Sequence, residues 1–155
     1  MLQFSQALLY EEYHFSGLSE MLIARSLKNP YVVGQAFYWA LKANLYIKPS
    51  YERYYTLLEQ FLMLCGRFIG ELDIQTMINK GFAEVSISLT SFKKTEPQEN
   101  VIQKTREKMV EVRKKFPLLF TCALEPKFVA RDIIYANCRA FRSAKKPLLI
   151  FLNNH

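Results

Sequence analysis

A basic turn near the C-terminus carries the residue types best suited to chemistry in this chain. Residues 142–147 read Arg-Ser-Ala-Lys-Lys-Pro and combine a hydroxyl, backbone N–H groups and ammonium groups. These are the donors with which proteins bind phosphate oxygens. The same residues could instead form a solvated basic hairpin turn, since the turn contains no glycine and matches neither a Walker A loop nor a glycine-rich kinase loop.

Two predicted strands position this turn. In residues 133–141 the even-numbered positions are Ile, Ala, Cys and Ala, and this alternation is the period-2 pattern of one continuous strand. Residues 148–152 are an apolar run of strand length, and Pro147 fixes where that strand begins because proline has no N–H. The sequence therefore predicts a hairpin whose turn is the candidate phosphate cradle.

The chain before this hairpin has helical periodicity. Apolar side chains three and four positions apart predict helices over residues 2–10, 16–28, 30–45, 51–64, 69–92 and 98–116. Ser16, Asn29 and Ser50 are the expected N-caps, and Gly66 is the expected helix stop. Gly34 lowers the helix propensity of its segment, so we expect it to permit a close helix crossing.

Two of these helices allow another interpretation. Residues 85–90 also alternate as a strand would, but the apolar stripe continues unbroken from Ile74 to Phe92, so helix is preferred. The helix over residues 98–116 is basic and amphipathic, with a Glu111–Lys115 pair expected on its polar face. Such a helix can bind a membrane surface or calmodulin, but its full apolar stripe favours docking on neighbouring helices.

Composition and charge restrict the class of protein. Half of the 155 residues are hydrophobic, too many for a disordered chain, and no apolar run reaches the ~18 residues of a membrane span. The N-terminus lacks the basic region of a signal peptide. Three widely spaced cysteines without a Cys/His cluster indicate reduced cytosolic thiols and no metal site. Residues 93–155 carry a net charge of +8, but no nucleic-acid-binding motif, so nucleic acid is not an expected partner.

The basic turn resembles the phosphate-binding loop of the phosphoinositide 3-kinases. Residues 138–148, C-R-A-F-R-S-A-K-K-P-L, are similar to the C-R-x-M-x-S-A-K-R-P-L-W run that covers the ATP phosphates in that family. The core Ser143-Ala144-Lys145 and the following Pro147-Leu148 are intact. The chain departs from the pattern at Phe141, Arg142, Lys146 and Leu149.

The resemblance extends to the rest of the chain. Residues 2–11, L-Q-F-S-Q-A-L-L-Y-E, resemble an L-Q-L-V-Q-A-L-K-Y-E helix late in the helical accessory domain of the same family. Residues 22–29 and 34–42 are similar to that domain's L-x-x-R-A-L-x-N and G-H-F-L-F-W-x-L-R segments, in the same order. Residues 123–126 resemble the S-P-L-x-P run that leads into the kinase small lobe.

The resemblance implies a mainly α fold of stacked antiparallel helical hairpins, followed by a short β-hairpin. Residues 1–116 would be the C-terminal part of the helical accessory domain, 117–127 a linker, and 128–155 the start of the kinase small lobe. Ser143, Ala144 and Lys145 would contact the phosphates of ATP, with Phe141 in the wall of the nucleotide pocket. Mg²⁺ would accompany ATP in the parent enzyme, with its ligands outside this chain.

The resemblance also implies an activity and partners. The parent enzyme would phosphorylate inositol lipids with ATP in phosphoinositide signalling, as a cytoplasmic protein peripheral to membranes. Its partners would be the remainder of a kinase domain and a regulatory subunit. The D-R-H-x-x-x-N and D-F-G motifs of the family do not occur here, so no catalytic residue is assigned and the chain alone is expected to be inactive. The alternative is a stand-alone helical interaction module whose basic hairpin binds phosphate or lipid.

Overall fold

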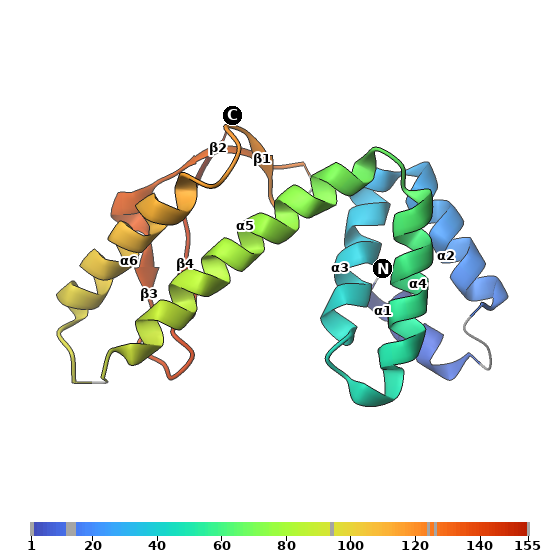
Figure 1. Cartoon of the computed structure of the whole chain (residues 1–155), viewed down its shortest axis with the longest axis horizontal. Helices are drawn as coiled ribbons and strands as arrows, with labels where there is room; N and C mark the ends of the chain where they lie inside the picture. Colours follow the sequence, from blue (N-terminus) through green and yellow to red (C-terminus); the bar gives the residue numbers. More distant parts are fainter. Residues whose placement is uncertain (1, 12–14, 94, 124, 126, 155) are drawn as a thin grey trace. The chain divides into compact units, whose positions relative to one another are not determined.

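The computed structural model describes residues 2–11, 15–93, 95–123, 125 and 127–154. Helices α1 to α6 come first, and strands β1 to β5 follow them (Figure 1). The chain is mainly α, as predicted. It divides into two compact units, Met1–Leu72 and Asp73–His155. No helix in the described ranges is long and apolar enough to cross a membrane. The predicted assignment of residues 1–116, 117–127 and 128–155 to parts of a longer kinase stays a prediction.

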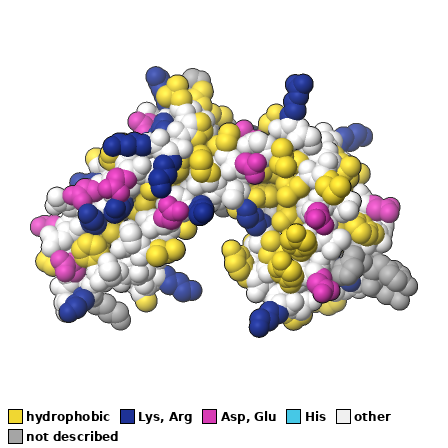
Figure 2. Space-filling view, in the orientation of Figure 1, with side chains coloured by type: hydrophobic (Ala, Val, Ile, Leu, Met, Phe, Trp, Pro, Cys, Tyr) yellow, Lys and Arg dark blue, Asp and Glu magenta, His cyan; other side chains and the backbone are white. Residues whose placement is uncertain are grey.

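The first unit is a group of packed helices. It contains α1 (Leu2–Ala7), α2 (Gly17–Lys28), the π-helical turn Pro30–Gly34, α3 (Gln35–Asn44), α4 (Tyr51–Leu64) and the start of α5 (Phe68–Ser88). Helices α3 and α4 supply most of its core, where the rings of Phe37 and Phe61 meet edge to face at 5.6 Å. Tyr55, Met63 and Leu64 of α4 stay exposed, and Figure 2 shows hydrophobic side chains on the surface of the helices of this unit.

Local signals at the helix ends are confirmed in part. Ser16 caps α2, because its Oγ accepts the Ser19 N–H at 3.2 Å while the Ser19 Oγ accepts the Ser16 N–H at 2.8 Å. Gly66 ends α4 with a φ of 56°. Ser50 was expected to cap α4 and does not. It already has a helical backbone conformation in a 3₁₀ turn, and its hydroxyl donates backward to the Ile47 carbonyl at 3.1 Å.

Gly34 lies where two helices approach closely, as the sequence predicts. A Cβ on Gly34 would lie 2.9 Å from the Ser26 carbonyl oxygen of α2 and 3.3 Å from the Phe61 ring of α4. A side chain at this position would therefore force the helices apart. The lost helix propensity of glycine is offset here by closer packing.

The second unit packs two helices against short strands. It contains the rest of α5, α6 (Gln98–Arg113), β1 (Phe120–Thr121), β2 (Val129–Ile133), β3 (Arg139–Ala140), β4 (Leu148–Leu149) and β5 (Leu152–Asn154). Strands β1, β2 and β5 form an antiparallel sheet in the order β1-β2-β5. Strands β3 and β4 form a hairpin in which Arg139 faces Leu149 and Ala140 faces Leu148.

The helical interpretation of residues 69–92 is confirmed up to Ser88. The apolar stripe of α5 continues through the disputed residues, where Val85 and Leu89 are buried against Met109 and Val112 of α6 and the strands. Burial of one helical face outweighs the local β propensity, since that burial requires the 3.6-residue period. Lys115, which follows the end of α6, lies 3.5 Å from Glu84 of α5, whereas Glu111 of α6 pairs with Lys108 at 2.7 Å. The predicted Glu111–Lys115 pair is therefore wrong.

The prediction of one continuous strand over residues 133–141 is wrong. Strand β2 ends at Ile133, a 3₁₀ turn occupies Tyr135–Asn137, and β3 begins at Arg139. The predicted second strand, residues 148–152, is also divided, since β4 pairs with β3 whereas β5 pairs with β2. Of the alternating residues, Cys138 and Ala140 are buried, but Ile134 and Ala136 are exposed. Alternation along the sequence also does not specify which strand is the partner.

Candidate phosphate-binding turn

The hairpin of β3 and β4 presents the predicted turn at its tip. The Phe141 N–H donates to the Pro147 carbonyl at 2.9 Å and closes the hairpin. The Lys146 N–H donates to the Ser143 carbonyl at 3.1 Å, so residues 143–146 form a β-turn with Ala144 and Lys145 at its centre. The structure therefore places the three predicted phosphate-binding residues together.

The tip of this turn offers donors to solvent. The side chains of Ser143, Ala144 and Lys145 are exposed. Within the described ranges, the N–H groups of Ala144 and Lys145 have no hydrogen-bond acceptor. A hydroxyl, an ammonium group and two amides are thus available at one turn. This donor set fits the oxygens of a phosphate group.

The opposite side of the turn is held by helix α5. The Ser86 hydroxyl donates to the Lys145 carbonyl at 3.0 Å and to the Lys146 carbonyl at 2.9 Å. Lys146 has a φ of 44°, a conformation that non-glycine residues adopt rarely, and its side chain is only 5% exposed. The structure therefore separates two lysines that are adjacent in sequence, since Lys145 faces solvent and Lys146 is buried.

A second contact holds the base of the hairpin to α6. The Gln98 Nε2 donates to the Ala140 carbonyl at 3.1 Å, and the Gln98 Oε1 accepts from the Arg142 Nε at 2.8 Å. Sequence reasoning identified neither Ser86 nor Gln98 as part of the site. Both are polar residues on helices, and their partners lie 42 to 60 positions away, so no local pattern connects them.

Comparison with known proteins identifies the family of the first unit. The accessory domain of the phosphoinositide 3-kinase family, the PIK domain, matches residues 1–72. Residues 1–72 belong to this family. The match covers the helices whose L-x-x-R-S-L-x-N and G-Q-A-F-Y-W-x-L-K segments carried the resemblance, and it ends where the first compact unit ends.

Individual known proteins are similar to this chain over both of its units. Phosphatidylinositol 3-kinase 2 of Dictyostelium discoideum is 32% identical over 99% of this chain, and phosphatidylinositol 3-kinase 1 of the same organism is 29% identical over 99%. Phosphatidylinositol 4-phosphate 3-kinase C2 domain-containing subunit alpha of Pongo abelii is 29% identical over 98%. The chain spans 8% to 9% of the length of these relatives.

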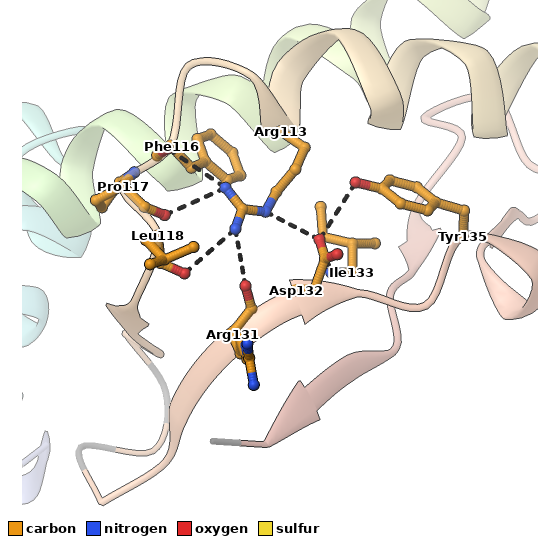
Figure 3. Close-up of polar contacts among 8 residues, drawn as sticks. All are labelled: Arg113, Phe116, Pro117, Leu118, Arg131, Asp132, Ile133 and Tyr135. Atoms are coloured by element: carbon orange, nitrogen blue, oxygen red, sulfur yellow. Dashed lines mark hydrogen bonds and ion pairs between the residues drawn. The ribbon is translucent and has the colours of Figure 1, made fainter.

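Arg113, at the end of α6, joins the helices of the second unit to the sheet (Figure 3). Its Nε donates to the Asp132 carboxylate at 3.0 Å. Its other guanidinium nitrogens donate to the carbonyls of Phe116, Pro117, Leu118 and Arg131. All five N–H donors of the side chain are therefore used. This contact fixes β2, and the chain continues from β2 to the hairpin that carries the turn.

Asp132 completes this cluster. Its Oδ1 also accepts the Ile133 N–H at 2.8 Å and the Tyr135 hydroxyl at 3.3 Å. The Ile133 N–H and the Arg113 guanidinium lower the pKa of the Asp132 carboxyl against the opposing effect of burial. The carboxylate therefore contacts both Ile133, the last residue of β2, and Tyr135, the first residue of the 3₁₀ turn that follows. The contacts of the cluster occupy all the N–H donors of Arg113, so Arg113 has no donor left for a ligand. Its role is therefore structural.

The structure places the remaining predicted site residue, Phe141, directly after β3 at the start of the turn, and Phe141 is 47% exposed. Its predicted role in the wall of a nucleotide pocket stays a prediction. Among the residues that the structure describes, no group of three or more His, Cys, Asp or Glu side chains could hold a metal ion.

Proposed function

We propose that this chain is a segment of a phosphatidylinositol 3-kinase in which the residue 143–145 turn contacts the phosphates of ATP. The exposed donors of this turn carry the proposal, since Ser86 holds its carbonyl side against α5 while Ser143, Ala144 and Lys145 stay accessible. The similarity of both units to phosphatidylinositol 3-kinases supports it.

The chemistry of the turn suits phosphoryl transfer. This reaction depends on positioning of the phosphates and on stabilisation of their negative charge. The Lys145 ammonium group would offset that charge, and the Ser143 hydroxyl and the two free amides would hydrogen-bond the oxygens. Phe141 would line the nucleotide pocket. Mg²⁺, which neutralises phosphate charge during transfer, would be held by residues outside this chain.

The catalytic reaction requires more than this segment. In the proposed parent enzyme the phosphoryl group of ATP is transferred to an inositol lipid, at a cytoplasmic site peripheral to the membrane. The remainder of the kinase domain would supply the catalytic base and the metal ligands, and a regulatory subunit would control the enzyme. We therefore expect no lipid kinase activity from the 155-residue chain by itself.

A chimera tests this proposal. The matching segment of phosphatidylinositol 3-kinase 2 of Dictyostelium discoideum would be replaced by this chain, and lipid phosphorylation would be measured against ATP concentration. We expect an active chimera, since the two sequences align over 99% of this chain. Lys145→Ala should reduce kcat/KM for ATP at least tenfold, the loss that removal of one charged hydrogen bond of about 1.5–3 kcal/mol produces.

Lys127→Ala is the matched control, because Lys127 is an exposed lysine of the same unit outside the turn. It should leave kcat/KM unchanged. Equal activity of the Lys145→Ala chimera and the unaltered chimera would overturn the assignment of the turn. A folded but inactive chimera would instead favour a stand-alone interaction module.

A further inference from the structure

A second basic site lies in a groove between α6 and the segment that joins β2 to β3. The groove has a volume of about 330 Å³ and is lined by Arg106, Asn137 and Arg139, with Ile102 and Phe151 as its apolar walls. This volume lies at the lower end of the range of small-molecule sites, roughly 300–1,000 Å³. None of the residues that line the groove belongs to the turn of residues 142–147 or to the Arg113 cluster. The groove is therefore separate from both.

Polar donors in this groove are available to a ligand. Arg106 donates from one terminal nitrogen to the Ala136 carbonyl, which fixes its guanidinium against the groove. In the part of the chain that the structure describes, its other N–H groups have no acceptor. The side chains of Asn137 and Arg139 likewise make no hydrogen bond or ion pair with any described residue. One arginine is therefore prepositioned, and two further donor side chains are unoccupied.

The charge around these donors favours an anion. No Asp or Glu lines the groove. Glu99 and Glu107 line an adjoining groove that shares Ile102 and Arg106, and Glu107 is paired with Lys104 at 3.1 Å. Burial raises the pKa of the Cys138 thiol, which also lines the groove, and the positive charge of Arg106 acts on it in the opposite direction. Arg106 itself lines the groove, so its positive charge lies at the site.

We propose that this groove binds a phosphate monoester. The two guanidinium groups match a phosphate dianion in charge and can each form paired N–H···O bonds with it. The Asn137 amide would donate to a further oxygen, and the organic part of the ester would lie against Ile102 and Phe151. The phosphate could belong to a free small molecule or to a lipid headgroup, because both present the same group.

Nuclear magnetic resonance titration of the full chain tests the proposal. The probes are inorganic phosphate and glycerol 3-phosphate. We expect saturable shifts of the amides of residues 136–139, with tighter binding of the ester because of its organic part. Arg139→Ala should weaken binding at least tenfold, since a charged hydrogen bond contributes about 1.5–3 kcal/mol. The Arg139 side chain makes no hydrogen bond or ion pair with any described residue, so this variant should fold normally, with an unchanged melting temperature as the check.

Lys127→Ala, which replaces an exposed lysine outside both the groove and the turn, is the matched control and should bind both probes as the unaltered chain does. The amide shifts of residues 136–139 report on the groove and those of residues 143–145 report on the turn, so either proposal can fail without the other. Shifts centred on residues 143–145, unchanged affinity of Arg139→Ala, or no saturable binding of either probe would each overturn the proposal.

Vesicles distinguish the two sources of the phosphate. Phosphatidylcholine vesicles with and without phosphatidic acid would be sedimented with the chain and with Arg139→Ala. Binding that requires both phosphatidic acid and Arg139 would assign the groove to a lipid headgroup. Binding of glycerol 3-phosphate without vesicle binding would assign it to a free phosphate ester.

Discussion

The Ser86 hydroxyl donates to the carbonyl of Lys146 at 2.9 Å, across 60 positions of sequence. It also donates to the Lys145 carbonyl at 3.0 Å, so one side chain of α5 holds two consecutive carbonyls of the turn. Lys146 has a positive φ, a conformation that costs a non-glycine residue of the order of 1 kcal/mol and therefore needs support from its surroundings. The geometry of the candidate phosphate-binding turn thus depends on a helix remote from it in sequence.

Replacement of Ser86 by alanine should loosen the turn. We expect a loss of about 1 kcal/mol in the free energy of unfolding, because the single O–H of Ser86, which is shared between the two carbonyls, is removed. The amides of Phe141 and Lys146, which close the hairpin and the turn, should exchange with solvent faster. Urea denaturation and amide hydrogen exchange measure these two effects.

Ser88→Ala is the control for this variant. Among the described residues, the Ser88 hydroxyl bonds only to the Val85 carbonyl of its own helix, and the change to alanine has the same effect on helix propensity. If Ser86→Ala and Ser88→Ala gave equal unfolding free energies and equal exchange rates, Ser86 would not support the turn.

Gly81 should not tolerate a side chain. A Cβ there would lie 2.7 Å from Val112 Cγ1 and 3.0 Å from the Phe116 ring, in the packed contact between α5 and α6. We expect Gly81→Ala to lower the free energy of unfolding by about 1–3 kcal/mol, as overpacking does. Gly70→Ala in the same helix meets nothing within 4 Å and should stabilise the chain by about 0.5–1 kcal/mol. Destabilisation by both changes would show that packing is not the cause.

Asp132 should make stability depend on pH in the acid range. The Ile133 N–H and Arg113 lower the pKa of its carboxyl, so the folded chain favours the carboxylate. The resulting stability is complete above the unfolded pKa of about 4 and is lost as pH falls through the lower folded pKa. Asp132→Asn should therefore show a smaller fall in melting temperature than the unaltered chain below about pH 4.

Glu99→Gln provides the comparison for this titration, since Glu99 is exposed. It should keep the pH dependence of the unaltered chain. An Asp132→Asn variant with that same pH dependence would show that the carboxylate does not contribute through its ionised form.

The three cysteines should differ in reactivity. Cys138 is fully buried and burial raises the pKa of its thiol, so little reactive thiolate forms near neutral pH. Cys65 and Cys122 are partly exposed. Alkylation followed by mass spectrometry should label these two first and Cys138 only when urea is present. Equal labelling of all three cysteines in the native chain would contradict the buried position of Cys138.

Local patterns in the sequence were sufficient to predict where the helices lie and where the basic turn lies. The Ser16 cap, the Gly66 stop and the stripe from Ile74 depend on neighbours within a few positions, so a single stretch of sequence contains their cause. The hairpin around residues 142–147 was predictable for the same reason, because the basic turn lies directly between two apolar stretches.

Only the tertiary structure decided how the strands divide and which donors the turn exposes. The break after Ile133 depends on contacts from Arg113 and Asp132, and the burial of Lys146 accompanies the contact with Ser86. These partners lie 19 to 60 positions apart, so their pairing follows from the packing of α5 and α6 and not from local periodicity. The sequence alone determined which residues could bind phosphate, whereas packing determined that Lys145 faces solvent and Lys146 does not.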